Sequence, residues 1–68
     1  MSHGRTILRV SATYHLEVEV GDVVRSGESI QKVPDTDELI VSPLSGTVES
    51  IQFDPGNHEF IIVIASQS

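Results

Sequence analysis

The sequence predicts an all-β fold, and three observations carry that prediction. Apolar residues alternate with polar ones over short stretches, as they do in half-buried strands. Glycine and proline separate these stretches at close intervals, which is typical of tight turns. No stretch repeats its apolar residues at helical spacing. With about seven short strands, we expect a small two-layer sandwich or flattened barrel.

Length and composition bound the fold further. The chain has 68 residues and is expected to form one domain, with residues 1–5 frayed. It contains no cysteine, so neither a disulfide nor a thiolate metal site can stabilise it. A core of this size rarely supplies more than about 3–5 kcal/mol, so we expect a protein partner or self-association to contribute. The longest apolar run, Phe60 to Ala65, is far too short for a membrane helix, which predicts no membrane insertion and a cytoplasmic location.

Charge is distributed unevenly along the chain. All four basic residues lie at or before Lys32, whereas the acidic residues continue to Glu59. An anionic surface repels phosphate backbones, and no basic stripe with interleaved aromatics is present, so nucleic-acid binding is not expected. We interpret the acidic surface mainly as a solvated face that keeps a small domain soluble, with a docking face for a basic partner as the alternative.

The first half of the chain is expected to contain four extended segments, which cover residues 7–10, 15–20, 23–28 and 29–33. The second segment has the clearest alternation, because Leu16, Val18 and Val20 share one face and acids occupy the other. Gly21 and Gly27 close the second and third segments and are predicted at corners that need a positive φ.

The second half is expected to contain three strands, which cover residues 39–41, 47–53 and 60–64. Pro34 ends the strand before them. The turns between them are marked by Gly46, Pro55 and Gly56, the last with an expected positive φ. In the middle strand Val48 and Ile51 have opposite parity, so a bulge near Glu49 and Ser50 is needed for both to face the core.

The two halves echo one another when the sequence is shifted by 35 positions. Val18 then falls on Phe53, and Gly21 falls on Gly56. The echo predicts an internal quasi-twofold repeat in which Gly21 and Gly56 occupy equivalent corners. The polar stretch 33–38 joins the halves and is predicted to be the tip of a hairpin.

Two runs of residues resemble biotinyl/lipoyl-attachment domains. Residues 20–30, VGDVVRSGESI, resemble the run V-G-D-x-V-x-x-G-x-x-L/I of these domains. Residues 40–48, IVSPLSGTV, resemble their second run, I-x-A/S-P-x-x-G-x-V. The resemblance implies a barrel-sandwich hybrid, a flattened β-barrel with quasi-twofold symmetry, in which the hairpin between the two runs would present a modified lysine.

At the hairpin tip the chain departs from this family. Asp35-Thr36-Asp37-Glu38 resembles the lipoyl pattern, but Glu38 stands in the place of the lysine, and a carboxylate cannot form the tethering amide. Lys32 lies before Pro34 on the strand that leads to the tip, and we interpret it as an ordinary surface lysine. An atypical carrier modified on Lys32 is the alternative. We therefore expect no covalent cofactor.

Two further resemblances suggest a role without a prosthetic group. Residues 21–24 and 42–51 are also similar to the sandwich-hybrid module of RnfC-type electron-transport subunits, and periplasmic adaptor proteins of efflux systems share the first run. In both settings the module is a structural or docking element. The resemblance therefore implies a non-catalytic module that binds a protein partner.

Candidates for catalysis or metal binding are few. His15 and His58 do not correspond under the repeat, and no serine lies in a nucleophile-elbow pattern, so no enzymatic activity is expected. Asp35, Asp37 and Glu38 could offer oxygen ligands to a hard cation, but a calcium loop would need more ligands and a glycine. We interpret them as a solvated tip, with binding of a metal or small ligand as the alternative.

The last strand is apolar on both faces. Phe60, Ile62 and Ile64 point one way, whereas Ile61 and Val63 point the other, and a two-layer domain has only one interior. Either the first strand folds over Ile61 and Val63, or these two residues contact a second copy or another protein.

Overall fold

The structure is a computed structural model that describes residues 4–34 and 39–66. As predicted, its regular structure is entirely β, and these residues include no helix that could cross a membrane. The strands are β1 (Arg5–Ser11), β2 (Val23–Val24), β3 (Ser29–Lys32), β4 (Leu39–Val41), β5 (Gly46–Asp54) and β6 (Glu59–Ser66).

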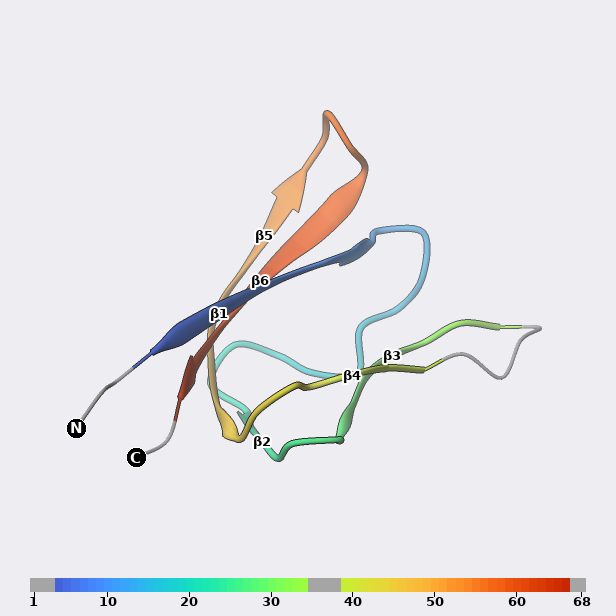
Figure 1. Cartoon of the computed structure of the whole chain (residues 1–68). Coiled ribbons are helices and arrows are strands. Elements are labelled where there is room, and N and C mark those ends of the chain that lie inside the picture. The colour runs from blue at the N-terminus through green and yellow to red at the C-terminus, as the bar shows by residue number, and fades with distance from the viewer. Residues whose placement is uncertain (1–3, 35–38, 67–68) are drawn as a thin grey trace.

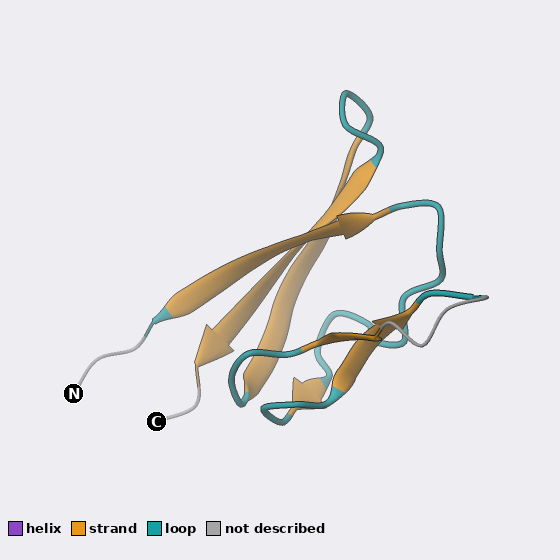
Figure 2. Ribbon diagram, turned by 45° about the vertical axis from the view of Figure 1, so that its right-hand side comes forward, coloured by secondary structure: helices purple, strands orange, loops and turns teal. Residues whose placement is uncertain are grey.

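The strands form one curled antiparallel sheet and one small hairpin (Figure 1). The large sheet has the order β1-β6-β5-β2, so β6 is hydrogen-bonded on both sides. The small sheet is the β3-β4 hairpin, which lies across one end of the large sheet, while the β5-β6 turn projects beyond the other end (Figure 2). The β3-β4 pairing agrees with the hairpin that the sequence predicts.

The hydrophobic core lies between the large sheet and the hairpin. Its buried members are Val10, Val18, Val24, Ile30, Val48, Ile62 and Ile64. They come from β1, β2, β3, β5 and β6 and from the loop after β1, so the core joins both sheets. Each fully buried aliphatic side chain contributes about 1.5–3 kcal/mol, which makes this cluster the main source of stability.

The predicted bulge in β5 is confirmed. The register between β5 and β6 shifts between Val48 and Ser50, so Glu49 is the extra residue. Val48 is buried and Ile51 packs against the core. The bulge thus lets residues of opposite parity face the same interior.

A second bulge, in β3, was not predicted. The register with β4 shifts between Ser29 and Gln31, and both Ile30 and Gln31 are buried. A buried amide needs hydrogen-bond partners. The Gln31 Nε2 donates to the carbonyl oxygens of Ser11, at 2.7 Å, and Tyr14, at 3.2 Å. Gln31 therefore ties the hairpin to the end of β1.

The strand predicted for residues 15–20 is not regular. Leu16 makes only an isolated bridge with Gln31, and Val20 is exposed instead of sharing the buried face of Val18. A local turn competes with strand pairing here, because the Glu19 N–H donates to the Asp22 carboxylate and the Asp22 N–H donates to the Glu19 carbonyl. The expectation of one shared apolar face is therefore wrong at Val20.

The equivalences of the internal repeat are not found at the positions that predicted it. Val18 is 6% exposed whereas Phe53 is 52% exposed. Gly21 has a φ of 98°, but Gly56 is not among the residues with positive φ, and in its turn His58 takes that role with a φ of 52°. The prediction of a positive φ at Gly56 is wrong, because the turn reaches the left-handed region two residues later.

Among the other turn residues, Gly27 has the positive φ expected of it, at 88°. Gly46 was expected in a turn but is the first residue of β5. A Cβ on Gly46 would lie 2.8 Å from the carbonyl carbon of Ala65 and overlap its oxygen. Glycine is needed there for the close approach of β5 to β6, since any side chain would force the two strands apart.

Candidate functional site

The outward face of the large sheet carries the residues that the sequence singled out for interaction. Ile61 and Val63 alternate with buried residues of β6, so their side chains point away from the core. In the register with β1, Ile7 lies beside Val63. We call Ile7, Ile61 and Val63 the outer row.

The outer row is only partly covered. Ile7 is 63% exposed, and Ile61 and Val63 are half-buried. The first strand was expected as one possible cover over Ile61 and Val63, but β1 lies beside β6 in the same sheet and does not fold over it. The alternative in which the first strand covers Ile61 and Val63 from above is therefore wrong, because β1 hydrogen-bonds to the edge of β6.

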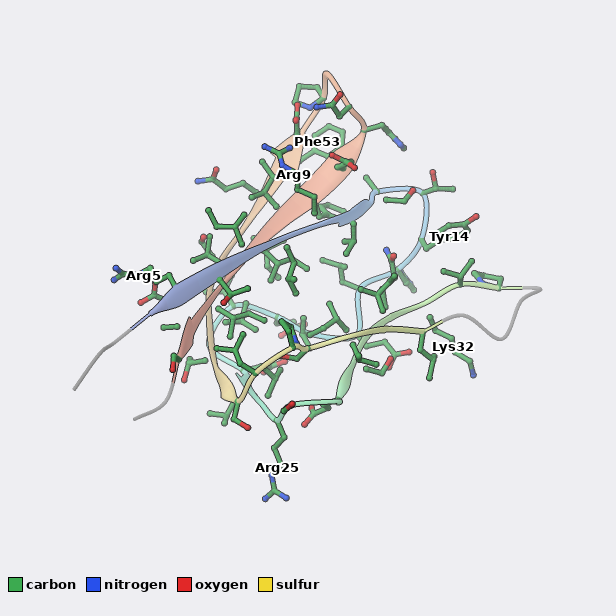
Figure 3. The ribbon with its side chains drawn as sticks, viewed as in Figure 1. Arg5, Arg9, Tyr14, Arg25, Lys32 and Phe53 are labelled. Atoms are coloured by element: carbon green, nitrogen blue, oxygen red, sulfur yellow. The ribbon has the colours of Figure 1, made fainter. Side chains whose placement is uncertain are left out.

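Two arginines of β1, Arg5 and Arg9, frame the outer row, and both are labelled in Figure 3. Arg5 Nε donates to Glu49 Oε1 of β5 at 2.5 Å. Arg9 Nη1 lies 3.3 Å from Asp54 Oδ2 of β5. Because β6 lies between β1 and β5, both side chains reach across β6, one toward each end of the outer row.

The frame is charged but exposed. The hydrogen bond to Glu49, followed by the charge of that carboxylate, raises the pKa of Arg5. Arg9 Nη1 also lies 3.6 Å from Glu59 Oε1, so one guanidinium faces two acids. Exposed ion pairs contribute little to stability, because water and salt screen their charges. The frame therefore acts mainly as a polar border around the outer row.

Asp54 joins this border to the β5-β6 turn. Its Oδ1 accepts a hydrogen bond from the Gly56 N–H at 3.0 Å, and its Oδ2 accepts one from Asn57 Nδ2 at 3.0 Å. The bond from the Asn57 side chain, aided by the Gly56 N–H and by Arg9, holds the pKa of the Asp54 carboxyl below its ordinary value. Asp54 therefore keeps its charge to a lower pH than an ordinary aspartate does.

The candidates at the hairpin lie apart from this surface. Lys32 is the exposed last residue of β3, opposite Leu39, and Figure 3 places it on the side of the molecule away from Arg5. Pro34 follows at the start of the turn. The tip residues Asp35, Asp37 and Glu38 lie outside the described residues. Within residues 4–34 and 39–66, no three acidic or histidine side chains gather as a metal site.

The two described histidines occupy different parts of the fold. His58 lies in the β5-β6 turn, where its ring meets that of Phe53 edge-on at a centroid distance of 5.7 Å. His15 is exposed in the loop after β1. The part of the chain that the structure describes contains no cavity. The aromatic pair is a packing feature of the projecting turn, and the ring of Phe60 also lies 6.0 Å from that of Phe53, centroid to centroid.

Sequence reasoning missed the arginine frame. The predicted strand began at Ile7, whereas β1 begins at Arg5 and runs to Ser11. Extending the alternation outward from Ile7 would have placed Arg5 and Arg9 on the same face as Ile7. Their acidic partners, Glu49 and Asp54, could not be predicted from this alternation. Which residues of β5 lie within reach of β1 depends on the register of both strands with β6, which lies between them.

In comparisons with known proteins, no family model, no curated protein and no solved structure matches this chain. The outer row and its arginine frame are therefore the features from which a function is inferred.

Proposed function

We propose that this chain is a non-catalytic protein-docking module of biotinyl/lipoyl-like, barrel-sandwich hybrid fold, without a covalent prosthetic group. The outer row carries the proposal. Antiparallel sheets with one solvated face usually place polar residues there, whereas β6 places Ile61 and Val63 on that face. Apolar side chains in that position are better explained by a partner than by the fold itself.

The surroundings of the outer row match the anatomy of a protein interface. Such interfaces have an apolar centre and a polar, solvent-accessible rim. Here the centre is Ile61 and Val63, and the rim is formed by the pairs Arg5–Glu49 and Arg9–Asp54. Burial of the two centre residues by a partner would contribute at most about 1.5–3 kcal/mol each before the costs of association.

The barrel-sandwich part of the proposal is supported by the second layer. The β3-β4 hairpin packs through Ile30 onto the core of the curled sheet, and an isolated bridge joins Leu16 to Gln31 of the hairpin. Two packed layers around one core are what such a fold requires. The proposal does not depend on the internal repeat.

A carrier modified on Lys32 is the second candidate, favoured by the exposure of this lysine at the hairpin. Intact mass separates the two functions. The chain is expected to keep its unmodified mass when it is expressed together with biotin and lipoyl ligases. A mass increment that maps to Lys32 would support the carrier and contradict the docking module without a prosthetic group.

The docking role is tested by a double variant, Ile61→Thr with Val63→Thr, which keeps β propensity and removes apolar surface. We expect the folded double variant to lose partners that the parent retains in cross-linking and mass spectrometry of native extracts. Gln52→Ala is the matched control, because Gln52 is exposed beside Ile61 on β5. Unchanged partners and an unchanged association state in the double variant would contradict docking through the outer row.

A further inference from the structure

The β1 strand is an open edge of the large sheet. It pairs with β6 on one side, and no described strand pairs with its other side. Its register is regular over all seven residues, with neither a bulge nor a proline. Proteins usually protect such edges by shortening or interrupting them, as the two-residue β2 does at the opposite edge. In Figure 1, β1 lies in front of β6 and β5, and no described segment is drawn over it.

The direction of the backbone groups of β1 follows from the ends of its ladder. The Ser66 N–H donates to the Gly4 carbonyl, and the Ala12 N–H donates to the His58 carbonyl. Hydrogen-bonded pairs alternate along an antiparallel ladder, so the even-numbered residues of β1 face β6. The odd-numbered residues, Arg5, Ile7, Arg9 and Ser11, direct their N–H and C=O groups to the open edge. Within the described residues, only the Ser11 carbonyl among these groups has a hydrogen-bond partner, the Gln31 amide.

We infer that the open edge of β1 binds the β1 of a second copy of this chain, antiparallel, with Leu8 on the twofold axis. This register pairs residue 5 with 11, 6 with 10 and 7 with 9, so all of Arg5–Ser11 is used. Ile7 and Arg9 then meet as a hydrogen-bonded pair through their free groups. At the Arg5–Ser11 pair, the Ser11 N–H is free, whereas the Ser11 carbonyl already accepts from Gln31. The inference rests on the proposed docking role and deepens it by naming the partner.

Charge selects this register over its neighbours. Only shifts that keep odd residues opposite odd residues preserve the hydrogen bonds. A register centred on Ile7 would place Arg5 directly opposite Arg9 of the second copy. A register centred on Arg9 would place the Arg9 residues of the two copies opposite each other. Like charges directly opposite one another are destabilising. Centring on Thr6 would pair only three residues of each β1. With Leu8 at the centre, Arg9 faces Ile7 and Arg5 faces Ser11.

The pairing also extends the outer row across two molecules. Ile7 of one copy would lie beside Arg9 of the second copy, whose own neighbour on β6 is Ile61. On the inward face, Leu8 would meet Leu8 of the second copy, which adds to the apolar cluster that Leu8 joins in each core. The edge and the outer row therefore form one continuous contact surface.

The test uses the full 68-residue chain and a pair of charge variants at Ile7, which is exposed and so tolerates either charge. Sedimentation velocity over a range of concentrations is expected to show a dimer. Ile7→Lys places a cation opposite Arg9 of the second copy on both sides of the twofold axis, and should raise the dissociation constant about tenfold or more. Ile7→Glu places an anion there and should leave the dimer intact or strengthen it.

A thiol pair reads the register directly, because the chain has no cysteine. Residues at a non-hydrogen-bonded antiparallel pair have Cα atoms about 4.5 Å apart, within the range for a disulfide. Leu8→Cys is therefore expected to give a disulfide-linked dimer under mild oxidation. In the control, Ile7→Cys, the two thiols would lie diagonally, beyond disulfide reach, and cross-linking should be at least tenfold slower.

Each remaining outcome decides against the inference in a distinct way. A parent chain that stays monomeric at the highest concentration overturns self-pairing, while the double variant of Ile61 and Val63 still tests docking of another protein. If Ile7→Lys and Ile7→Glu weaken the dimer equally, and Leu8→Cys gives no cross-link, edge pairing is overturned. The outer row then remains as the contact. If neither charge variant at Ile7 changes the dissociation constant and Leu8→Cys gives no cross-link, both the β1 edge and the outer row are overturned as the contact.

Discussion

The two faces of β6 carry the same kind of residue and have different fates. Ile62 and Ile64 are fully buried, whereas Ile61 and Val63, one position away along the strand, are half-buried. The inward face is covered by the β3-β4 hairpin and by Val18 from the loop after β1. Across the outward face, the described residues place the side chains of Arg5 and Arg9. The difference shows that neighbouring elements, and not hydrophobicity, decide how deeply an apolar residue is buried.

The largest expected effect separates the two faces by stability. Ile62→Ala should lower the free energy of unfolding by about 2–5 kcal/mol, because it opens a cavity in the core. Ile61→Ala should cost less than about 1.5 kcal/mol, since part of the side chain is already hydrated. Urea unfolding of both variants at one concentration measures the difference. Equal losses would mean that the outward face is covered as well as the inward one.

An intermediate effect concerns the glycines that border the two faces. Gly21 holds the loop that covers the inward face, and its N–H donates to the Val48 carbonyl at 2.8 Å. Because its φ is positive, Gly21→Ala should cost about 1 kcal/mol or more. Gly56→Ala should cost less, since Gly56 has no positive φ and its Cβ would require Asp54 Oδ1, at 3.3 Å, to move by only a few tenths of an ångström. Thermal unfolding compares the two, and similar losses would restore the equivalence that the internal repeat predicted.

The smallest expected effect lies on the outward face and depends on pH. The folded-state pKa of Asp54 is lowered from 3.8, so its contribution to stability is present above 3.8 and is lost as the pH falls through the lower folded value. Asp54→Asn should therefore destabilise the chain slightly at neutral pH, with a difference that disappears in acid. Urea midpoints of the parent and the variant across that range measure it. A difference that persists well below 3.8 would assign the role of Asp54 to the shape of its turn and not to its charge.

Local patterns in the sequence predicted much of the fold. Alternation and turn residues indicated the all-β class, the β3-β4 hairpin and the limits of β4, and parity indicated the bulge at Glu49. These features are set by residues close together in the chain, which is why a single sequence carries them. The irregular path of residues 15–20 escaped prediction because a side chain, Asp22, completes a turn that competes with the strand.

The candidate site also has some features that local sequence predicts and others that depend on distant segments. The sequence predicted Ile61 and Val63 as interaction residues, because side chains alternate between the two faces of a strand and both faces of this strand are apolar. The arginine frame, the open edge of β1 and the close approach at Gly46 depend on which strands lie side by side. By itself the sequence therefore determined that β6 has two apolar faces. Only the tertiary structure decided which face is core, because burial is set by contacts between segments that are distant in the chain.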